Sequence, residues 1–515
     1  MMGFLYAMGI DIGTTSTKAV IFQKDGTFVY RAGVEYPLHT PEPSAAEQDP
    51  DVIFRAVLAS IRTCIEESGI REEDIGFLSF SSAMHSLIAA DSEGRPLTPS
   101  ITWADSRSTK WTEKLKNEWN GHEIYMRTGT PIHPMAPLSK IIWLREEFPD
   151  LFRQTAKFIS IKEYVFYRLF GEYVIDYSIA SATGLFNLNT LDWDKEALRV
   201  AGIDTERLSK PVSTTHVVRG MAPGFAVEAG VRFDIPVVIG ASDGVLSNLG
   251  TGAIKQGDVA VTIGTSGAIR AVTSKPVTDP KGRIFCYALT KDHWVIGGPV
   301  NNGGMIFRWV RDELGAAETE AARRLGKDPY DVLTEVAARV PAGSEGLLFH
   351  PYFSGERAPL WNADARGSFF GLALHHKKEH MIRSVLEGIL YNLYTVLLAL
   401  EELTGEPQRI LATGGFAQSD FWRQMMADVF DHPVIVPESF ESSCFGAVLL
   451  GLYELGEIDS LDAAADAGGT VFEHVPDKAN SSVYRELIPS FIRIARLLEP
   501  EYKVIADFQR GLSLK

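Results

Sequence analysis

The sequence predicts an α/β protein with two similar halves, and three observations lead to this prediction. Runs of β-branched and apolar residues alternate with stretches of helical spacing, as in folds that cover a sheet with helices. A strand–turn–strand pattern around Ile12-Gly-Thr-Thr15 returns ~250 residues later around Ile263-Gly-Thr-Ser266, as expected of a duplicated architecture. The length of 515 residues is ample for two large domains. Chance similarity between two short Gly/Thr turns is the alternative explanation of the repeat.

The first half opens with a strand, a tight Gly/Thr turn and a second strand between Tyr6 and Phe22. Short apolar runs predict further strands at 77–80 and 237–240. Apolar residues at helical spacing predict helices over 52–67 and 138–147. Predicted strands and helices thus alternate along the first half, as in an α/β protein.

The second half repeats the hairpin over 259–272 and continues with a long helix over 381–403. The spacing of the apolar residues in that helix indicates ordinary core packing. A strand over 409–413 then leads through two glycines into another helix. We place the domain boundary just before the second hairpin, which gives domains over 1–249 and 250–515.

Composition limits the function classes. Hydrophobic residues make up 45% and charged residues 23%, so a disordered chain or a coiled coil is not expected. The net charge is −16, because 50 Lys and Arg stand against 66 Asp and Glu. Such a field repels phosphate backbones and anionic membrane surfaces, so we expect neither nucleic acid nor a membrane as partner.

Cysteine usage and hydropathy suggest where the protein works. The three cysteines, Cys64, Cys286 and Cys444, are far apart and form no CxxC pair, which fits a reduced interior. The apolar start from Met1 to Ile10 contains no basic residue, unlike a signal peptide. No uninterrupted apolar stretch reaches the ~18 residues of a membrane span. We therefore expect a cytoplasmic protein.

The first candidate site is the turn Asp11-Ile-Gly-Thr-Thr15. Glycine lets the backbone approach a phosphate closely, and the following amides and hydroxyls can donate to its oxygens. Asp11 could hold Mg²⁺ directly or through water, and Lys18 could reach phosphate charge. A plain hairpin turn is the alternative. The second turn at Gly264-Thr265 favours the functional interpretation, since two such turns would clamp the phosphates of one nucleotide.

More familiar phosphate loops are absent from the sequence. Gly-Lys occurs once, at Gly326-Lys327, without the preceding glycine of a Walker loop, and no GxGxxG follows a strand. Any phosphate chemistry must therefore use another scaffold.

Asp243 directly follows the predicted strand at 237–240. A carboxylate at the carboxyl end of a strand, beside glycines, is well placed to take a proton from a substrate hydroxyl. Asp243 could equally cap the helix that follows. The spacing alone leaves both interpretations open.

Glycines join elements at two further places, around Gly304 and at Gly414-Gly415 with Ser419 beyond. Bare backbone of this kind suits an adenine or a ribose, although routine turns explain both segments equally well. Polar and aromatic residues that suit a polyhydroxylated substrate follow strand-like runs; these are Met84, His85, Trp103, Asp105 and Arg107. Singly, each of these is more often structural. The histidines at 375, 376 and 380 indicate a solvated helix start rather than zinc.

Together these segments resemble the FGGY family of carbohydrate kinases, over nearly the whole chain. Residues 135–147 look like the first signature of that family and 367–387 like the second. Segments 47–50, 176–184 and 351–359 are also similar to it. The resemblance implies two duplicated actin/hexokinase/Hsp70-like (ribonuclease H-like) ATPase domains with a catalytic cleft between them.

The resemblance also implies roles for individual residues. Asp243 stands at the position of the general base, which also contacts the substrate. The expected contacts to Mg²⁺-ATP in the first domain are Asp11, Thr14, Thr15, Ser16 and Lys18, with the metal at Asp11. The expected nucleotide contacts in the second domain are Gly264, Thr265, Gly304, Gly415 and Ser419. The expected sugar contacts are Met84, His85, Trp103, Asp105, Arg107 and Tyr177.

Three segments, 80–86, 102–107 and 45–50, look most like those of the gluconate-specific bacterial members. Arg308 replaces the glutamine of the glycerol-specific members, which argues against glycerol and leaves the contact of Arg308 open. We therefore expect ATP-dependent phosphorylation of D-gluconate to 6-phosphogluconate, with a homodimer implied by the resemblance. The alternatives are another sugar kinase of the family, such as a xylulose kinase, and a non-catalytic actin-like ATPase or sugar-sensing regulator.

Overall fold

The structure is a computed structural model that describes residues 4–437, 441–464 and 470–513. The first three residues of the apolar start thus lie outside the described residues. Two compact units form; the first comprises Met1–Gln256, Val272–Ile296 and Ser439–Gly468, and the second comprises Gly257–Ala271, Gly297–Glu438 and Gly469–Lys515. The chain passes between the units several times, and the predicted boundary at residue 249 between contiguous domains stays a prediction.

The first unit is built on a six-stranded sheet with the order β13-β14-β5-β1-β2-β3. β1 pairs antiparallel with β2 and parallel with β5, and β5 pairs parallel with β14. The strands are β1 (Tyr6–Ile12), β2 (Ser16–Gln23), β3 (Phe28–Glu35), β5 (Ile75–Ser82), β13 (Val217–Val218) and β14 (Val237–Ser242). The predicted opening hairpin and both later strands are therefore present.

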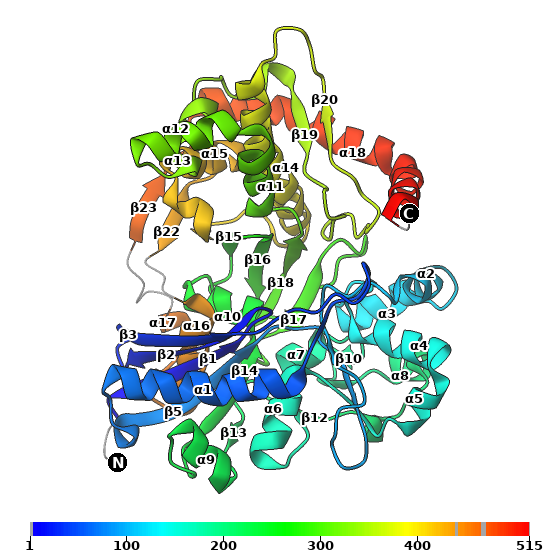
Figure 1. Ribbon diagram of the computed structural model, residues 1–515, viewed down its shortest axis with the longest axis vertical. Helices are drawn as coiled ribbons and strands as arrows, with labels where there is room; N and C mark the ends of the chain where they lie inside the picture. The colour runs from blue at the N-terminus through cyan, green and yellow to red at the C-terminus, as the bar shows by residue number, and fades with distance from the viewer. Residues whose placement is uncertain (1–3, 438–440, 465–469, 514–515) are drawn as a thin grey trace. The chain divides into compact units, whose positions relative to one another are not determined.

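Helices cover both faces of this sheet, as Figure 1 shows. α1 (Pro50–Ser68) packs on one face, and α10 (Asp243–Gly250) and α16 (Ser442–Glu454) pack on the other. Met8 and Ile10 of β1 belong to the core beneath α1, whereas the intervening Ala7 belongs to the core that contains α16. Because both faces are buried, the strand appears in the sequence as a continuous apolar run.

Smaller elements complete the first unit. α6 begins with a capping box in which the Ser160 hydroxyl accepts from the Glu163 amide and the Glu163 carboxylate accepts from the Ser160 amide. The helices are α2 (Thr109–Asn117), α3 (Gly121–Thr128), α4 (Pro137–Glu147), α5 (Pro149–Gln154), α6 (Ile161–Phe170), α7 (Tyr177–Ser181), α8 (Lys195–Ala201), α9 (Pro223–Ala229) and α17 (Leu461–Ala464). The short strands are β4 (Glu47–Gln48), β6 (Ile88–Ala90), β7 (Ser100–Ile101), β8 (Lys157–Ile159), β9 (Val174–Asp176), β10 (Phe186–Asn187), β11 (Asp192–Trp193) and β12 (Lys210–Val212).

The second sheet has the order β17-β18-β16-β15-β21-β22-β23. β15 pairs antiparallel with β16 and parallel with β21, as β1 pairs with β2 and β5. The strands are β15 (Asp258–Ile263), β16 (Gly267–Thr273), β17 (Phe285–Ala288), β18 (Trp294–Val300), β21 (Arg409–Thr413), β22 (Val434–Pro437) and β23 (Thr470–His474). Since β18-β16-β15-β21-β22-β23 matches β3-β2-β1-β5-β14-β13, the sheet order supports duplication rather than a chance repeat of two turns.

α14 (Lys378–Thr404) is the central helix of the second unit. All six apolar residues that set its predicted spacing are fully buried; they are Val385, Leu386, Ile389, Leu390, Leu393 and Leu397. Within the described ranges it is the single helix long and apolar enough to cross a membrane, and 78% of its most apolar window is buried in the protein. Its hydropathy is thus that of a core helix, as the sequence predicts.

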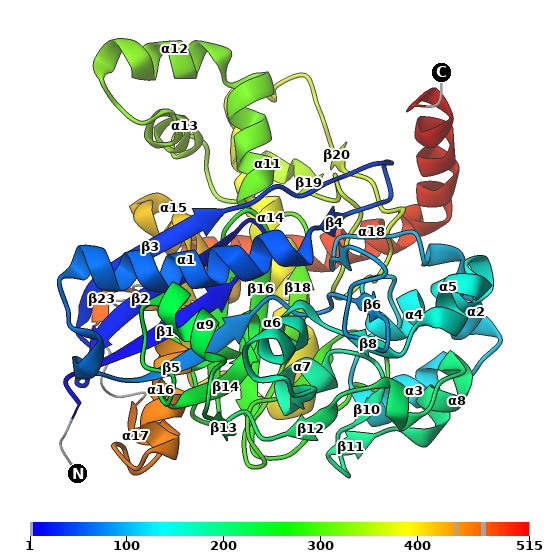
Figure 2. The same cartoon turned by 60° about the horizontal axis from the view of Figure 1, so that its bottom comes forward.

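The remaining helices of the second unit surround α14. α11 (Gly304–Trp309) continues into a π-helical turn at Val310–Leu314, and Figure 2 shows α12 (Ala316–Leu325) and α13 (Pro329–Ala337) beyond it. The other elements are α15 (Asp420–Phe430), α18 (Lys478–Ser513), β19 (Leu348–His350) and β20 (Ser368–Phe370).

Candidate active site

The first Gly/Thr turn joins β1 to β2, and Asp11 lies near the end of β1, just before this turn. The Gly13 amide donates to the Ser16 carbonyl oxygen across the turn at 2.9 Å. The Thr14 hydroxyl accepts from the Trp103 indole nitrogen at 3.0 Å. The turn predicted for phosphate and one residue predicted for sugar are therefore in direct contact within the first unit.

Asp11 and Asp243 lie close enough to influence each other's charge. Loss of solvent and, to a smaller extent, the negative charge of Asp243 together raise the pKa of Asp11 to about 6. The Ser81 hydroxyl, which donates to Asp11 Oδ1 at 2.7 Å, opposes that shift in pKa. Two neighbouring carboxylates are the oxygen ligands that Mg²⁺ prefers, so this pair fits the metal predicted at Asp11.

Lys18 is already paired. Its ammonium group donates to Glu441 Oε2 at 2.9 Å, and Arg31 donates to Glu441 Oε1 at 2.7 Å. Glu441 lies 423 residues away along the chain, so the spacing around the turn gave no sign of it. A phosphate contact from Lys18 would therefore have to share the lysine with Glu441.

Asp243 is the first residue of α10, and Ser242 occupies the N-cap position. Asp243 Oδ1 accepts from the Gly244 amide at 2.6 Å. The side chain is half-buried at the carboxyl end of β14. The placement at the strand end agrees with the sequence prediction, and the cap position itself belongs to Ser242.

His85 follows β5 and has a left-handed backbone, with φ of 69°. Its Nδ1 lies 2.7 Å from the Ala182 carbonyl oxygen, which can only accept, so Nδ1 carries a proton. In the neutral ring the lone pair is then on Nε2, 3.4 Å from the Tyr287 hydroxyl. In that tautomer Nε2 can accept a hydrogen bond from the Tyr287 hydroxyl, whereas Met84 beside it offers apolar surface.

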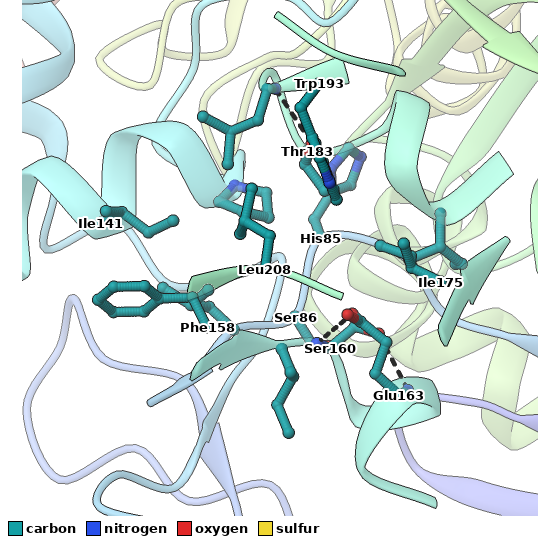
Figure 3. A pocket seen from close by; sticks show the side chains of 15 residues that line it. His85, Ser86, Ile141, Phe158, Ser160, Glu163, Ile175, Thr183, Trp193 and Leu208 are labelled. Carbon is teal, nitrogen blue, oxygen red and sulfur yellow. Dashed lines mark hydrogen bonds between the residues drawn. The ribbon is translucent and has the colours of Figure 1, made fainter. Parts of the chain in front are cut away.

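Behind His85 lies a small cavity of about 20 Å³, drawn in Figure 3. Apolar side chains such as Ile141 and Phe158 line most of it, and Glu163 reaches it from α6. The volume has room for about one water molecule. Burial raises the pKa of Glu163 to about 7, with a smaller upward contribution from Asp176.

Glu163→Gln is expected to remove a pH dependence of stability. Because the folded pKa lies above the ordinary value, the contribution of Glu163 to stability is fully present below pH 4.5 and is lost as the pH rises towards about 7. The amide oxygen of glutamine can still accept from Ser160, so the variant should be more stable at pH 8 by up to about 3 kcal/mol. Urea unfolding at pH 5 and pH 8 measures this, with the exposed Glu118→Gln as control. Parallel pH profiles for all three chains would contradict it.

Asp105 and Arg107 are paired with each other. Arg107 Nε donates to Asp105 Oδ2 at 2.9 Å, a second guanidinium nitrogen donates to Glu47, and the guanidinium lies 4.7 Å from the centre of the Trp143 ring. Asp105 is 1% exposed and also accepts from the Ala46 amide. Arg107, one of the predicted sugar contacts, is thus already neutralised by two carboxylates.

Lys140, in the first signature-like segment, is fully buried and supports the sugar segments. Its ammonium group donates to the carbonyl oxygens of His85 and Thr102, each at 2.7 Å, and to that of Ile101 at 3.3 Å. Burial lowers its pKa to about 7. Tyr177, the last predicted sugar contact, is half-buried as the first residue of α7.

In the second unit, one cavity brings together every nucleotide contact predicted for the second domain. Its volume is about 590 Å³, within the range of small-molecule sites. Its lining includes all five predicted residues, namely Gly264, Thr265, Gly304, Gly415 and Ser419. Aromatic side chains that the sequence did not single out form another part of the wall; they are Phe307, Tyr330, Phe416 and Trp422. Glycine backbone is suited to binding phosphates, and an aromatic wall is suited to binding the base of a nucleotide.

The second Gly/Thr turn rests on the segment 301–304. The Gly304 amide donates to the Gly264 carbonyl oxygen at 2.7 Å. A Cβ atom on Gly303 would lie 2.5 Å from the Ser266 carbonyl oxygen, so only glycine allows this approach. Arg308, left open by the sequence, is exposed and lines the cavity.

Glu356 is hydrogen-bonded to the same segment, residues 301–304. One of its oxygens accepts from the amides of Asn301 and Arg357, and the other from the side chains of Asn302 and Asn392. The four distances lie between 2.6 and 2.9 Å, and Glu356 is fully buried. The sequence offered no signal for this role, because three of the four donors come from distant segments.

The histidines near the start of α14 do not form a metal centre. Across residues 4–437, 441–464 and 470–513, no three His, Cys, Asp or Glu side chains are grouped so as to hold a metal ion.

Comparison with known proteins identifies the family. Residues 6–250 match the N-terminal domain of the FGGY family of carbohydrate kinases, and residues 259–455 match its C-terminal domain. The chain belongs to the FGGY family of carbohydrate kinases. The family and the duplicated actin/hexokinase-like ATPase fold expected from the sequence are thereby confirmed.

Among members of the FGGY family, the gluconokinase of Bacillus subtilis is 60% identical over 508 residues, covering 98% of this chain and 99% of the relative. A crystal structure of gluconate kinase from Lactobacillus acidophilus matches with a TM-score of 0.92 and 39% identity, covering 97% of this chain and 99% of the other. A structure of ligand-bound xylulose kinase from Lactobacillus acidophilus matches with the same coverage, TM-score and identity.

Proposed function

We propose that the protein transfers the γ-phosphoryl group of ATP to D-gluconate and releases ADP and 6-phosphogluconate. The observation that carries this proposal is the 60% identity to a gluconokinase over 98% of the chain. A xylulose kinase is the second candidate, because one structural neighbour at 39% identity bears that description. The higher identity favours gluconate.

In the proposed reaction, Asp243 accepts the proton of the terminal hydroxyl of gluconate as that oxygen attacks phosphorus. The bond from the γ-phosphorus to the bridging oxygen breaks, and ADP leaves. Asp243 suits this task because it is half-buried at a strand end and its neighbour Gly244 donates to one carboxylate oxygen. Positioning and electrostatics supply most of the rate in phosphoryl transfer.

Nucleotide binding is assigned to the residues predicted for it. Thr14, Thr15, Ser16 and Lys18 would contact phosphates from the first unit, and the glycine-walled cavity with Thr265 and Ser419 would hold the nucleotide in the second. Asp11, beside Asp243, would hold Mg²⁺. When bound, that ion would neutralise charge on the phosphoryl oxygens. The catalytic cleft between the two halves stays a prediction.

The contacts to the sugar acid would come from His85, Met84, Trp103 and Tyr177. The Asp105–Arg107 pair would support this wall rather than bind the carboxylate of gluconate, because each already neutralises the other. A cytoplasmic location fits the three free, buried cysteines. Assembly as a homodimer stays a prediction.

Gluconate-dependent ADP release tests the proposed function. We expect steady turnover with ATP, Mg²⁺ and gluconate, and loss of turnover when EDTA removes the metal. Identification of 6-phosphogluconate as the product, by mass spectrometry, would support the assignment. ADP release that does not depend on gluconate would contradict it.

A further inference from the structure

The last two residues of β14, Ala241 and Ser242, are held from one side by the segment that runs from α6 to α7. We propose that Ser178, supported by Lys162, is a positioning residue that sets the direction of the Asp243 carboxylate. This inference rests on the proposed function, in which Asp243 is the general base.

β14 needs such support because its pairing with β5 is irregular at this end. The register shifts between Val238 and Ala241, and Gly240 lies in the left-handed region with φ of 69°. A Cβ atom on Gly240 would lie 1.7 Å from the Phe80 carbonyl oxygen, so the two strands approach very closely there. Bulges of this kind bend a strand and redirect the side chains that follow, and Asp243 follows three residues later.

The Ser178 hydroxyl makes two hydrogen bonds to the residue before Asp243. It accepts from the Ser242 amide at 3.1 Å and donates to the Ser242 hydroxyl oxygen at 2.9 Å. Ser178 and Ser242 are both fully buried, so water cannot replace either bond. The hydroxyl therefore determines where the first turn of α10 begins.

Lys162 holds the residue one position earlier. Its ammonium group donates to the Ala241 carbonyl oxygen at 3.2 Å and to Asp176 Oδ2 at 2.8 Å. The side chains of Lys162 and Asp176 are 2% and 1% exposed. Asp176 Oδ1 also caps α7 by accepting from the Ile179 amide at 2.9 Å. One buried ion pair thus joins the end of β14 to the start of α7.

The contacts of Ser178 bear on how Asp243 is aligned with the hydroxyl of the substrate. α7 begins with Tyr177, a proposed sugar contact, and the next residue is Ser178. A general base must lie within hydrogen-bonding distance of the proton that it takes, and a displacement of ~1 Å can cost about 100-fold in rate. A contact that ties Asp243 to the sugar segment should therefore affect kcat more than binding.

Ser178→Ala tests this, with Ser181→Ala as the matched control. Ser181 is also a fully buried serine of α7; its hydroxyl accepts from the Ala288 amide and donates to the Ser178 carbonyl oxygen at 2.8 Å, and neither bond reaches β14. For Ser178→Ala we expect kcat to fall by about 10- to 100-fold while KM for gluconate and for ATP changes less than about threefold. Ser181→Ala should keep kcat within about threefold of the unaltered enzyme. Urea unfolding should show a similar loss of stability in both.

A double variant tests whether Ser178 acts through Asp243. In an Asp243→Asn background, Ser178→Ala should lower the residual rate no further, because the group that it positions is gone. Equal kcat losses in Ser178→Ala and Ser181→Ala, or additive losses in the double variant, would overturn the inference while leaving the proposed function intact. If the unaltered chain does not phosphorylate gluconate or any related acceptor, both the proposed function and the inference are wrong.

Discussion

Asp243→Asn is expected to lower kcat by at least about 100-fold, because the amide cannot take a proton from the attacking hydroxyl. ADP affinity should change little, since the nucleotide cavity of the second unit is lined by other residues. The substitution also removes the negative charge that raises the pKa of Asp11, so the pKa of Asp11 should fall towards its ordinary value. Steady-state ADP release and calorimetric ADP binding measure the two main effects.

The exposed Asp234→Asn, just before β14, is the control for this experiment. It should leave both kcat and ADP affinity unchanged. One result for Asp243→Asn would instead support a purely structural role. If the variant unfolds more easily and loses ADP binding together with activity, Asp243 serves mainly to start α10.

Glu356→Gln is expected to have the largest effect on stability. The carboxylate accepts four hydrogen bonds, two on each oxygen, so it needs both oxygens as acceptors. Glutamine replaces one oxygen by an NH₂ group that faces two donors, at a side chain that is fully buried. We expect the free energy of unfolding to fall by about 3 kcal/mol.

The same variant should bind ADP more weakly, because Glu356 supports the segment beneath the second Gly/Thr turn. Urea unfolding and calorimetry measure the two effects, and the exposed Glu335→Gln of α13 is the control. Unchanged stability in Glu356→Gln would mean that the four hydrogen bonds contribute nothing. Unchanged ADP affinity despite lost stability would show that segment 301–304 does not shape the nucleotide site.

Local patterns in the sequence predicted those parts of the fold and site that depend on neighbouring residues. The two Gly/Thr hairpins and the burial of one face of α14 follow from β-branched runs, turn residues and helical spacing. The position of Asp243 after β14 follows in the same way. The five predicted nucleotide contacts of the second unit share one cavity, since each lies in a turn after a strand or at the start of a helix.

Pairings between distant segments were not predictable, because no local pattern encodes them. Lys18 pairs with Glu441, which lies 423 residues further along the chain, and Arg107 pairs with Glu47. The burial of Lys140 and Lys162 was equally unexpected, because lysine is rarely fully buried. Tyr330 of α13 is part of the aromatic wall of the nucleotide cavity. The sequence of α13 does not show that this helix lies near the second Gly/Thr turn.

These pairings alter the electrostatic problem that the composition raises. The chain carries a net charge of −16, yet both proposed substrates are anions. Lys18 and Arg107 already pair with carboxylates, so Lys18 would share its charge between Glu441 and a phosphate, and Arg107 has little charge left for gluconate. In the proposed reaction, backbone amides of the two Gly/Thr turns and Mg²⁺ would therefore provide most of the local attraction.

The central claim is best tested by comparing kcat/KM for gluconate, xylulose, ribulose and glycerol under identical conditions with ATP and Mg²⁺. We expect kcat/KM for gluconate to exceed that of each other acceptor by at least about 100-fold, because a site built to hydrogen-bond its substrate rejects analogues that leave buried polar groups unpaired. A higher kcat/KM for xylulose, or for any other acceptor in the set, would contradict it.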